Sequence, residues 1–276
     1  MRAPLVNVIP TEKLKFTEWV HEGAFETVVK AIHSAGSFEV VVKRCKGSRQ
    51  EANKIAMNEA VILCKLHHTN VVSFLGVTQY KGQINVMMES ISGINLEKVL
   101  FNPTLKIHLS PDLKSHISEG ITRAIVYLHH PSIFIIHCDV KPSNIIVDTK
   151  TMTAKLCDLG SACTSESLVI GNKCLGEEAF LRRGTLLYRA PEVQLYEKPN
   201  SVASDVWALS ATIVTIFAEA LVWPVKDVNN CEKEITEKLL FQETTQTSKL
   251  PNFLITPIKK CFSYIIEQRP TQSSFC

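Results

Sequence analysis

The sequence predicts an α+β protein in two lobes, a small β-rich lobe with one main helix and a larger lobe that is mostly helical. Two observations predict this fold. Up to about residue 89, short apolar runs with strand-like alternation surround a single helical pattern. After residue 93, apolar residues recur mainly at helical spacing. The chain has 276 residues, 45% of them hydrophobic, so it can bury a sizeable core.

In the first lobe, strands are expected at 28–29, 38–43 and 84–88, and a helix at 51–66. One face of that helix carries Ile55, Ile62, Leu63 and Leu66. Glu59 falls on the same face. Because an unpaired buried charge is costly, Glu59 either has a cationic partner or lies at the edge of the stripe and reaches water.

A short polar stretch at 90–93 is a candidate linker, and the pattern beyond it is mainly helical. One helix is marked by Leu113, Ile117, Ile121, Ala124 and Leu128. Residues 144–147 and 154–157 are expected to pair as a hairpin around the turn-prone 148–151. The most apolar stretch, 207–223, contains Glu219 and several hydroxyl residues, so it is predicted to be a buried core helix rather than a membrane span.

Charge and cysteine content narrow the function classes. The 30 Lys+Arg and 27 Asp+Glu residues give a net charge of +3 without a basic stripe, which argues against nucleic-acid binding. The nine cysteines form no C-x-x-C pair, so reduced, mostly buried thiols are expected. The N-terminus has no signal-peptide pattern. We therefore expect an intracellular, cytoplasmic monomer without membrane insertion, with the nucleus left open as a location.

Two segments carry groups suited to phosphoryl transfer. His137-Cys-Asp-Val-Lys-Pro-Ser-Asn144 is followed after the expected hairpin by Asp158-Leu-Gly160. Phosphoryl transfer needs a carboxylate that orients the acceptor, a cation near the γ-phosphate, and oxygen ligands for Mg²⁺. Asp139, Lys141, Asn144 and Asp158 supply these groups. Taken alone, such a match also arises by chance.

The match is not isolated, because the chain resembles the catalytic domain of eukaryotic-type protein kinases. The segment 137–144 resembles the catalytic loop, 158–160 the metal-binding D-F-G with Leu for Phe, 190–192 the A-P-E triplet, and 40–43 the V-A-I-K motif. Glu59 matches the glutamate expected to pair with Lys43. Asp205 matches the buried aspartate of the family, and Arg269 the arginine that pairs with Glu192. The resemblance implies one kinase domain over 1–276, with an N-lobe at about 12–90, a hinge at about 89–93 and a C-lobe at about 94–276.

The resemblance also implies ATP and Mg²⁺ as cofactors and assigns site residues. The catalytic group comprises Asp139, Lys141, Lys43 and Glu59. The nucleotide group comprises Gly23, Val28, Val41, Lys43, Met88, Glu89, Ile91, Asn144, Ile146 and Asp158. Asn144 and Asp158 are the expected metal ligands.

Two departures from the family pattern bear on activity. The Gly-rich loop of the family reads G-x-G-x-x-G-x-V, and the matching residues 21–28 keep only its middle glycine, Gly23. Glu26 stands in place of the last glycine, which brings a negative charge towards a polyanionic ligand. Cys138 replaces the arginine that binds a phosphorylated activation loop in relatives. We therefore expect weaker nucleotide binding and no dependence on activation-loop phosphorylation.

Three functions stay open. Lys141-Pro-Ser-Asn144 and Gly184-Thr185 resemble the serine/threonine branch, in particular Mos-like and tyrosine-kinase-like kinases, which implies transfer of the γ-phosphate of ATP to protein Ser/Thr hydroxyls. In that branch Thr185 is expected to hydrogen-bond near Asp139 and Lys141. The first alternative is a pseudokinase scaffold that binds nucleotide weakly and acts through protein partners. The second, a small-molecule phosphotransferase, is disfavoured by residues 190–192.

Overall fold

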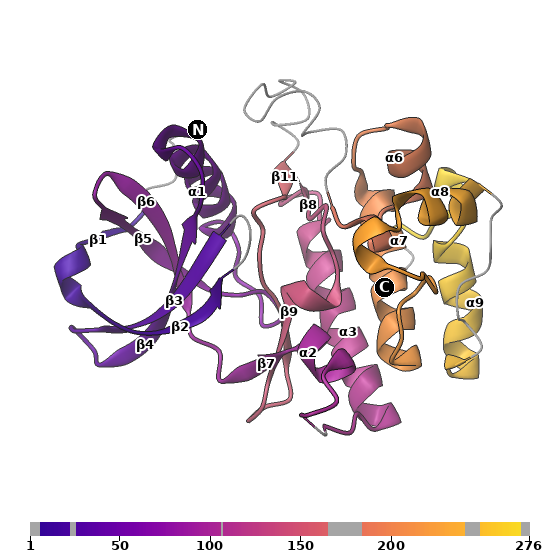
Figure 1. The fold of residues 1–276 in the computed structure, drawn as a ribbon, viewed down its shortest axis with the longest axis horizontal. Helices are drawn as coiled ribbons and strands as arrows, with labels where there is room; N and C mark the ends of the chain where they lie inside the picture. The colour runs from indigo at the N-terminus through magenta and orange to yellow at the C-terminus, as the bar shows by residue number, and fades with distance from the viewer. Residues whose placement is uncertain (1–5, 23–25, 106, 165–183, 241–248, 272–276) are drawn as a thin grey trace. The chain divides into compact units, whose positions relative to one another are not determined.

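The computed structural model describes residues 6–22, 26–105, 107–164, 184–240 and 249–271. The chain divides into two compact units (Figure 1). The first comprises residues 1–92 together with 158–160, and the second comprises 93–157 and 161–276. The first is rich in strands and the second in helices, which confirms the predicted α+β fold.

The described residues of the first unit form a six-stranded sheet in the order β1-β5-β6-β4-β3-β2. Its strands are β1 (Val8–Ile9), β2 (Leu14–Glu22), β3 (Glu26–His33), β4 (Phe38–Cys45), β5 (Phe74–Tyr80) and β6 (Gln83–Glu89). Only the β1–β5 pair is parallel among these. Helix α1 (Arg49–Leu63) packs against β4 and β6. The three strands expected from the sequence are therefore present.

The register of the sheet sorts its residues onto two faces, because directly opposed residues of an antiparallel pair point the same way. One face is part of the core and carries Ala31, Val40, Val42 and Met87. On the other face Val28 lies opposite Lys43, and Val41 lies opposite Met88. The sheet thus brings four of the predicted nucleotide-site residues onto one face.

Helix α1 begins after Ser48, whose hydroxyl accepts a hydrogen bond from the N–H of Glu51. It ends at Leu63 and not at Leu66 as expected, because residues 65 and 66 donate to carbonyls three positions back and tighten the chain into turns. Its buried residues include three alanines, whereas Ile55 is only half-buried. The apolar stripe predicted from the large side chains was therefore partly wrong.

The part of the second unit that the structure describes contains two small sheets. Strand β9 (Ile145–Asp148) pairs with β10 (Ala154–Leu156), which confirms the predicted hairpin, and with β7 (Gly93–Asn95) on its other side. Strand β8 (Ile135–Ile136) pairs with β11 (Cys163–Thr164). The helices among its described residues are α2 (Leu96–Phe101), α3 (Pro111–Leu128), α6 (Pro191–Tyr196), α7 (Val202–Ala218), α8 (Glu232–Leu240) and α9 (Asn252–Cys261).

Helix α7 is the apolar helix expected at 207–223, but it begins and ends five residues earlier than predicted. Ser201 and Ser204 form a capping box that starts it, and Glu219 ends it by adopting a left-handed conformation with φ 49°. The helix is buried along nearly its whole length and packs against α3.

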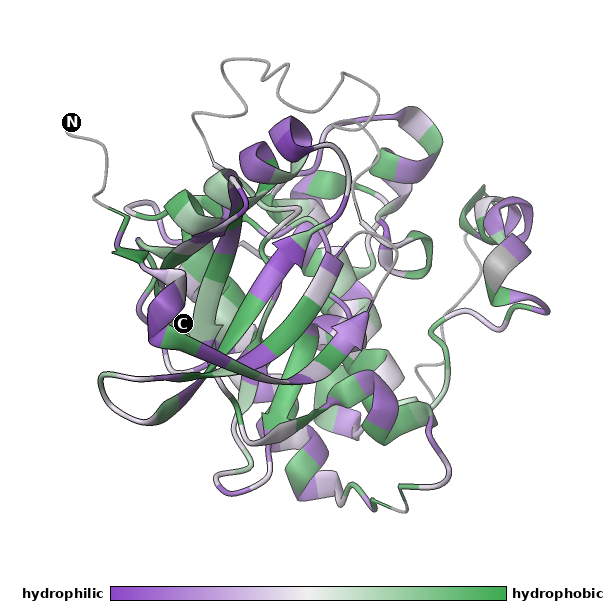
Figure 2. Cartoon of the chain, turned by 60° about the vertical axis from the view of Figure 1, so that its left-hand side comes forward, coloured by the Kyte–Doolittle hydropathy of each residue, from purple (hydrophilic) through white to green (hydrophobic). Residues whose placement is uncertain are grey.

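Figure 2 shows how hydrophilic and hydrophobic segments alternate along the strands and shorter helices. No helix in the described ranges is long and apolar enough to cross a membrane.

Candidate active site

The first unit gathers charged side chains around Lys43, which β4 holds on the face described above. Its Nζ lies 3.0 Å from Glu59 Oε1 and 2.5 Å from Asp158 Oδ1, so the expected Lys43–Glu59 ion pair is present. A third carboxylate also reaches it, because Glu26 Oε2 lies 2.9 Å from the same nitrogen. Glu26 opposes Cys45, two positions beyond Lys43, so the two side chains are diagonal neighbours on one face.

This cluster sets the protonation of Lys43 and Glu59. Burial alone would lower the pKa of Lys43, but the carboxylates of Glu59, Asp158 and Glu26 raise it well above its usual range. Burial raises the pKa of Glu59, and Lys43 offsets that effect in part. Among the described residues, Oε2 of Glu59 has no hydrogen-bond partner. Lys43 is therefore protonated, and its single positive charge is in contact with three carboxylates.

The turn at 158–160 positions the carboxylate of Asp158. Asp158 has a left-handed conformation with φ 51°, and its Oδ1 accepts a hydrogen bond from the N–H of Gly160 at 3.0 Å. A Cβ at Gly160 would lie 3.1 Å from that oxygen and 3.5 Å from Lys43 Nζ. Glycine at this position leaves room for the cluster.

The other nucleotide-site residues predicted in the first unit lie at the end of β6 and in the Gly-rich loop. The Glu89 carboxylate accepts a hydrogen bond from the N–H of Ser73 at 2.7 Å, so this side chain fixes the end of the strand. Ile91 follows and is half-buried. Gly23 lies outside the described residues.

In the second unit, Asp139 is the centre of a hydrogen-bonded network. Its Oδ1 accepts from the N–H of Thr185 at 2.8 Å and from the Thr185 hydroxyl at 2.9 Å. Its Oδ2 lies 2.9 Å from Lys141 Nζ, and Lys141 also donates to the Thr185 hydroxyl at 2.6 Å. Thr185 therefore makes both of the contacts expected of it.

Asn144 completes this network. It lies in a 3-10 turn at Pro142–Asn144, and its Nδ2 donates to the Asp139 carbonyl at 2.8 Å and to Asp139 Oδ2 at 3.2 Å. With the amide nitrogen so bonded, the oxygen of Asn144 is left for a cation. Ile146 follows on β9, where its side chain is half-buried.

Asp205, on α7, binds the main chain at the start of the segment 137–144. Its carboxylate accepts from the N–H of His137 at 2.7 Å and of Cys138 at 2.9 Å, and it lies 2.9 Å from His129 Nε2. Gly184 also lies against this loop, with φ 95°, and a Cβ there would collide with the Cys138 carbonyl oxygen. The buried aspartate and the glycine before Thr185 thus fix the main chain on which Asp139 sits.

Arg269 and Glu192 form a buried ion pair in the second unit. The guanidinium of Arg269 donates to both oxygens of Glu192, each at 2.7 Å, and its central carbon lies over the ring of Trp207, 5.0 Å from the ring centre. This confirms the predicted Glu192–Arg269 pair and anchors the start of α6.

The residues present fit ATP and Mg²⁺ in their chemistry. The carboxylate of Asp158 and the amide oxygen of Asn144 are hard oxygen donors of the kind that Mg²⁺ takes alongside substrate phosphates. Lys43 is a charged ammonium suited to phosphate oxygens. Within the described residues, no three His, Cys, Asp or Glu side chains are grouped so as to hold a metal ion by themselves.

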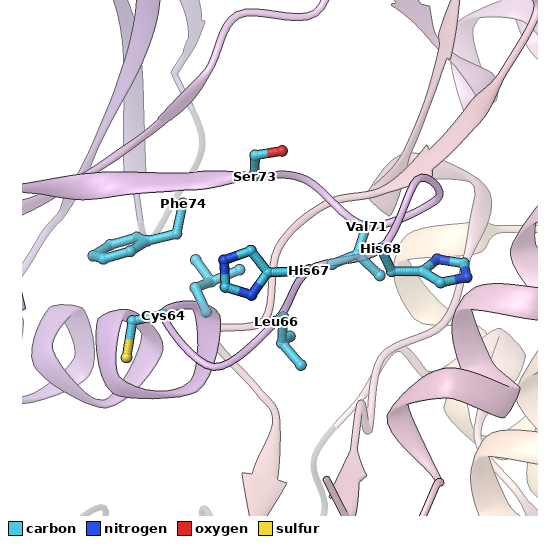
Figure 3. Close-up of a pocket in the computed structure, with 8 residues that line it drawn as sticks. Cys64, Leu66, His67, His68, Val71, Ser73 and Phe74 are labelled. Atoms are coloured by element: carbon cyan, nitrogen blue, oxygen red, sulfur yellow. The ribbon is translucent and has the colours of Figure 1, made fainter. Parts of the chain in front are cut away.

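A separate hollow in the first unit lies where α1 leads into β5 (Figure 3). It is lined by Leu63, Cys64, Leu66, His67, His68, Val71, Ser73 and Phe74. Nδ1 of His68 accepts from the N–H of Asn70, and the Cys64 thiol donates to the Val61 carbonyl. None of the site residues predicted from the sequence lines it.

The fold and the two clusters around Lys43 and Asp139 are typical of kinases. A model of the protein kinase domain matches residues 15–276, so the chain belongs to the protein kinase domain family.

Several curated proteins that are similar to this chain are named as protein kinases. Cysteine-rich receptor-like protein kinase 27 of Arabidopsis thaliana is 30% identical over 211 residues, which are 75% of this chain and 31% of that protein. Cysteine-rich receptor-like protein kinase 19 from the same plant is 33% identical over 200 residues, 71% of this chain and 30% of that protein. The match with kinase 45 of that series covers 76% of this chain and 58% of the relative at 30% identity. The chain thus corresponds to under a third of the length of the first two relatives.

Proposed function

We propose that the chain is an active serine/threonine protein kinase. The observation that carries this proposal is the network around Asp139, in which Thr185 and Lys141 bond both to the carboxylate and to each other. A carboxylate fixed in this way can orient an incoming hydroxyl, and Lys141 beside it can neutralise negative charge. Lys141 and Thr185 are also the residues that resemble the serine/threonine branch.

ATP and Mg²⁺, when bound, would supply the transferable γ-phosphoryl group and the cation that neutralises its charge. Lys43 would bind phosphate oxygens, and Glu59 would keep its ammonium in position. Asp158 and Asn144 would hold the metal, while Asp139 would orient the acceptor hydroxyl and take its proton on a carboxylate oxygen.

The test measures transfer of labelled γ-phosphate from ATP to peptides that contain Ser, Thr or Tyr, followed by identification of the modified residue. Asp139→Asn and Asp158→Asn each remove one carboxylate charge with little change in shape, and both are expected to abolish transfer. Asp112→Asn, an equal change at an exposed position in the first turn of α3, is the matched control and is expected to leave transfer unchanged. Equal transfer by wild type and Asp139→Asn, or labelling of Tyr alone, would contradict the proposal.

Independence from activation-loop phosphorylation is part of the same proposal. Cys138, which takes the place of the phosphate-binding arginine, is buried and carries no positive charge. Phosphatase treatment is therefore expected to leave the rate of transfer unchanged, and a large loss of activity would count against this part.

One observation favours a second candidate, a pseudokinase scaffold that binds nucleotide weakly. The Glu26 carboxylate contacts the Lys43 ammonium and so competes with phosphate oxygens for it. This candidate predicts weak ATP binding without measurable transfer, whereas the first predicts transfer that Asp139→Asn removes.

A further inference from the structure

Two cysteine side chains from different segments meet in the second unit. Cys138 lies in the catalytic loop directly before Asp139, and Cys163 begins β11, 25 residues further along the chain. Their sulfur atoms are 3.2 Å apart, and both residues are buried, with exposed fractions of 6% and 2%. Both are present as thiols.

The main chain holds the two thiols together from both sides. Strands β8 and β11 pair so that Ile136 opposes Cys163, and Cys138 follows two residues after Ile136, just beyond the end of β8. Cys138 has a left-handed conformation with φ 68°, and its N–H is bound to Asp205 Oδ1. The pair lies in an apolar cluster with Ile136 and Val202. The approach of the sulfurs therefore follows from fixed backbone positions and not from two freely rotating surface side chains.

We propose that Cys138 and Cys163 are an oxidisable dithiol, which hydrogen peroxide converts to a disulfide between the catalytic loop and β11. In the first step one thiol loses its proton and its sulfur attacks an oxygen of the peroxide, so that the O–O bond breaks and the residue becomes a sulfenic acid. The hydroxide released takes up the proton from the thiol and leaves as water. The second thiol then attacks that sulfur and displaces its hydroxyl as a second water. In sum, two thiols and one hydrogen peroxide give one disulfide and two waters.

The geometry suits the second step. A disulfide bond is about 2.05 Å long, so the sulfurs must approach by roughly 1 Å. Because the resolving thiol already lies beside its target, this step is intramolecular and competes well with further oxidation of the sulfenic acid.

Burial sets which oxidant acts. The apolar surroundings and small exposed fractions oppose the direct docking of a bulky disulfide such as oxidised glutathione far more than the approach of a molecule as small as hydrogen peroxide. We therefore expect hydrogen peroxide to form the bond in the folded protein much faster than oxidised glutathione does at the same concentration.

The first experiment reads the bond itself, so its result does not depend on whether the chain transfers phosphate. The folded full chain is treated with hydrogen peroxide or with oxidised glutathione, then unfolded, alkylated, digested and analysed by mass spectrometry. The expected product of peroxide is a pair of linked peptides containing Cys138 and Cys163, two hydrogens lighter than their sum and separated by reductant. If both cysteines remain alkylated while other thiols oxidise, or if Cys138 links mainly to another cysteine, the proposal is wrong.

Matched variants sharpen the result. Cys163→Ser is expected to abolish the link and to leave Cys138 as a sulfenic acid that a dimedone probe captures. Cys261→Ser removes another buried thiol, one hydrogen-bonded to Ser210, and is expected to keep the link at wild-type yield. Loss of the link in Cys261→Ser would overturn the pairing. Should Cys163→Ser fail to fold, the peptide map of the wild type decides alone.

Discussion

The contact between Glu26 and Lys43 predicts that this chain binds ATP more weakly than its other site residues would permit. Glu26 Oε2 lies 2.9 Å from Lys43 Nζ, on the same side of the sheet as Val28 and Val41. Under the proposed function the phosphates of ATP must compete with this carboxylate for the ammonium and also meet its negative charge. Glu26→Gln keeps the length of the side chain and removes the charge, so it is expected to tighten ATP binding.

The size of the effect follows from the burial of the pair. The Lys43 side chain is 3% exposed, whereas that of Glu26 is 27% exposed and is partly screened by water. Exposed ion pairs contribute roughly 0.2–1 kcal/mol, and breaking a fully buried pair costs about 3–5 kcal/mol. An intermediate value of about 1–2 kcal/mol corresponds to a dissociation constant for ATP that is roughly five- to thirty-fold lower in Glu26→Gln.

Calorimetric titration of ATP, with and without Mg²⁺, measures this change directly. Glu26→Gly, which restores the family's glycine, is expected to act in the same direction. The matched control is Glu22→Gln, because Glu22 contacts the exposed Lys46 at 3.2 Å and not Lys43. Its dissociation constant is expected to stay within about two-fold of the wild type. An unchanged or higher dissociation constant in Glu26→Gln would refute the electrostatic argument.

Three further predictions concern other parts of the chain. Arg269→Met leaves the buried Glu192 carboxylate without its bidentate partner and should lower the free energy of unfolding by about 3–5 kcal/mol in urea titrations, with partial recovery in the double variant Arg269→Met/Glu192→Leu. Burial raises the pKa of Cys45 to about 11, so its contribution to stability is present below about pH 9 and is lost as the pH rises to about 11. Between about pH 9 and pH 11 the urea midpoint of the wild type should therefore fall more steeply with pH than that of Cys45→Ala, and equal pH slopes in the two proteins would contradict this. Thr185→Ala removes the hydroxyl bonded to Asp139 and should lower kcat about ten-fold with little change in ATP affinity, whereas Thr185→Ser should retain activity.

Most secondary structure was predictable because hydrophobic periodicity is a local property of the sequence. The hairpin of β9 and β10 and the helices α3 and α7 follow from such patterns. The ends of α7 did not, since they depend on the capping box at Ser201 and on the left-handed conformation of Glu219. Neither feature alters the apolar pattern that predicted the helix.

In the candidate site, the predictable contacts were those that the family resemblance supplies. The pattern alone left open whether the Glu59 carboxylate has a cationic partner or reaches water, and the resemblance named Lys43 as its partner. The contact of Glu26 with Lys43 was missed because it depends on strand register, which places residues two positions apart in the pairing as diagonal neighbours. The contact of Cys163 with Cys138 was missed because it depends on the pairing of β8 with β11 and on the left-handed conformation of Cys138. The alternation of β3 and β4 would have indicated that Glu26 and Lys43 share a face, but not that their charged groups touch.

The two departures from the family pattern share a physical consequence. Glu26 directs a carboxylate at Lys43, the cation expected to bind phosphate, and Cys138 replaces the arginine expected to bind an activation-loop phosphate with a thiol. Each substitution removes or offsets positive charge, and each has a specific partner within its own unit, Lys43 in one case and Cys163 in the other. The cation expected to bind the phosphates of ATP is therefore contacted by a carboxylate, and the position expected to bind an activation-loop phosphate holds a thiol beside a second thiol. Removal of the charge at Glu26 acts on the first contact, and peroxide treatment acts on the second.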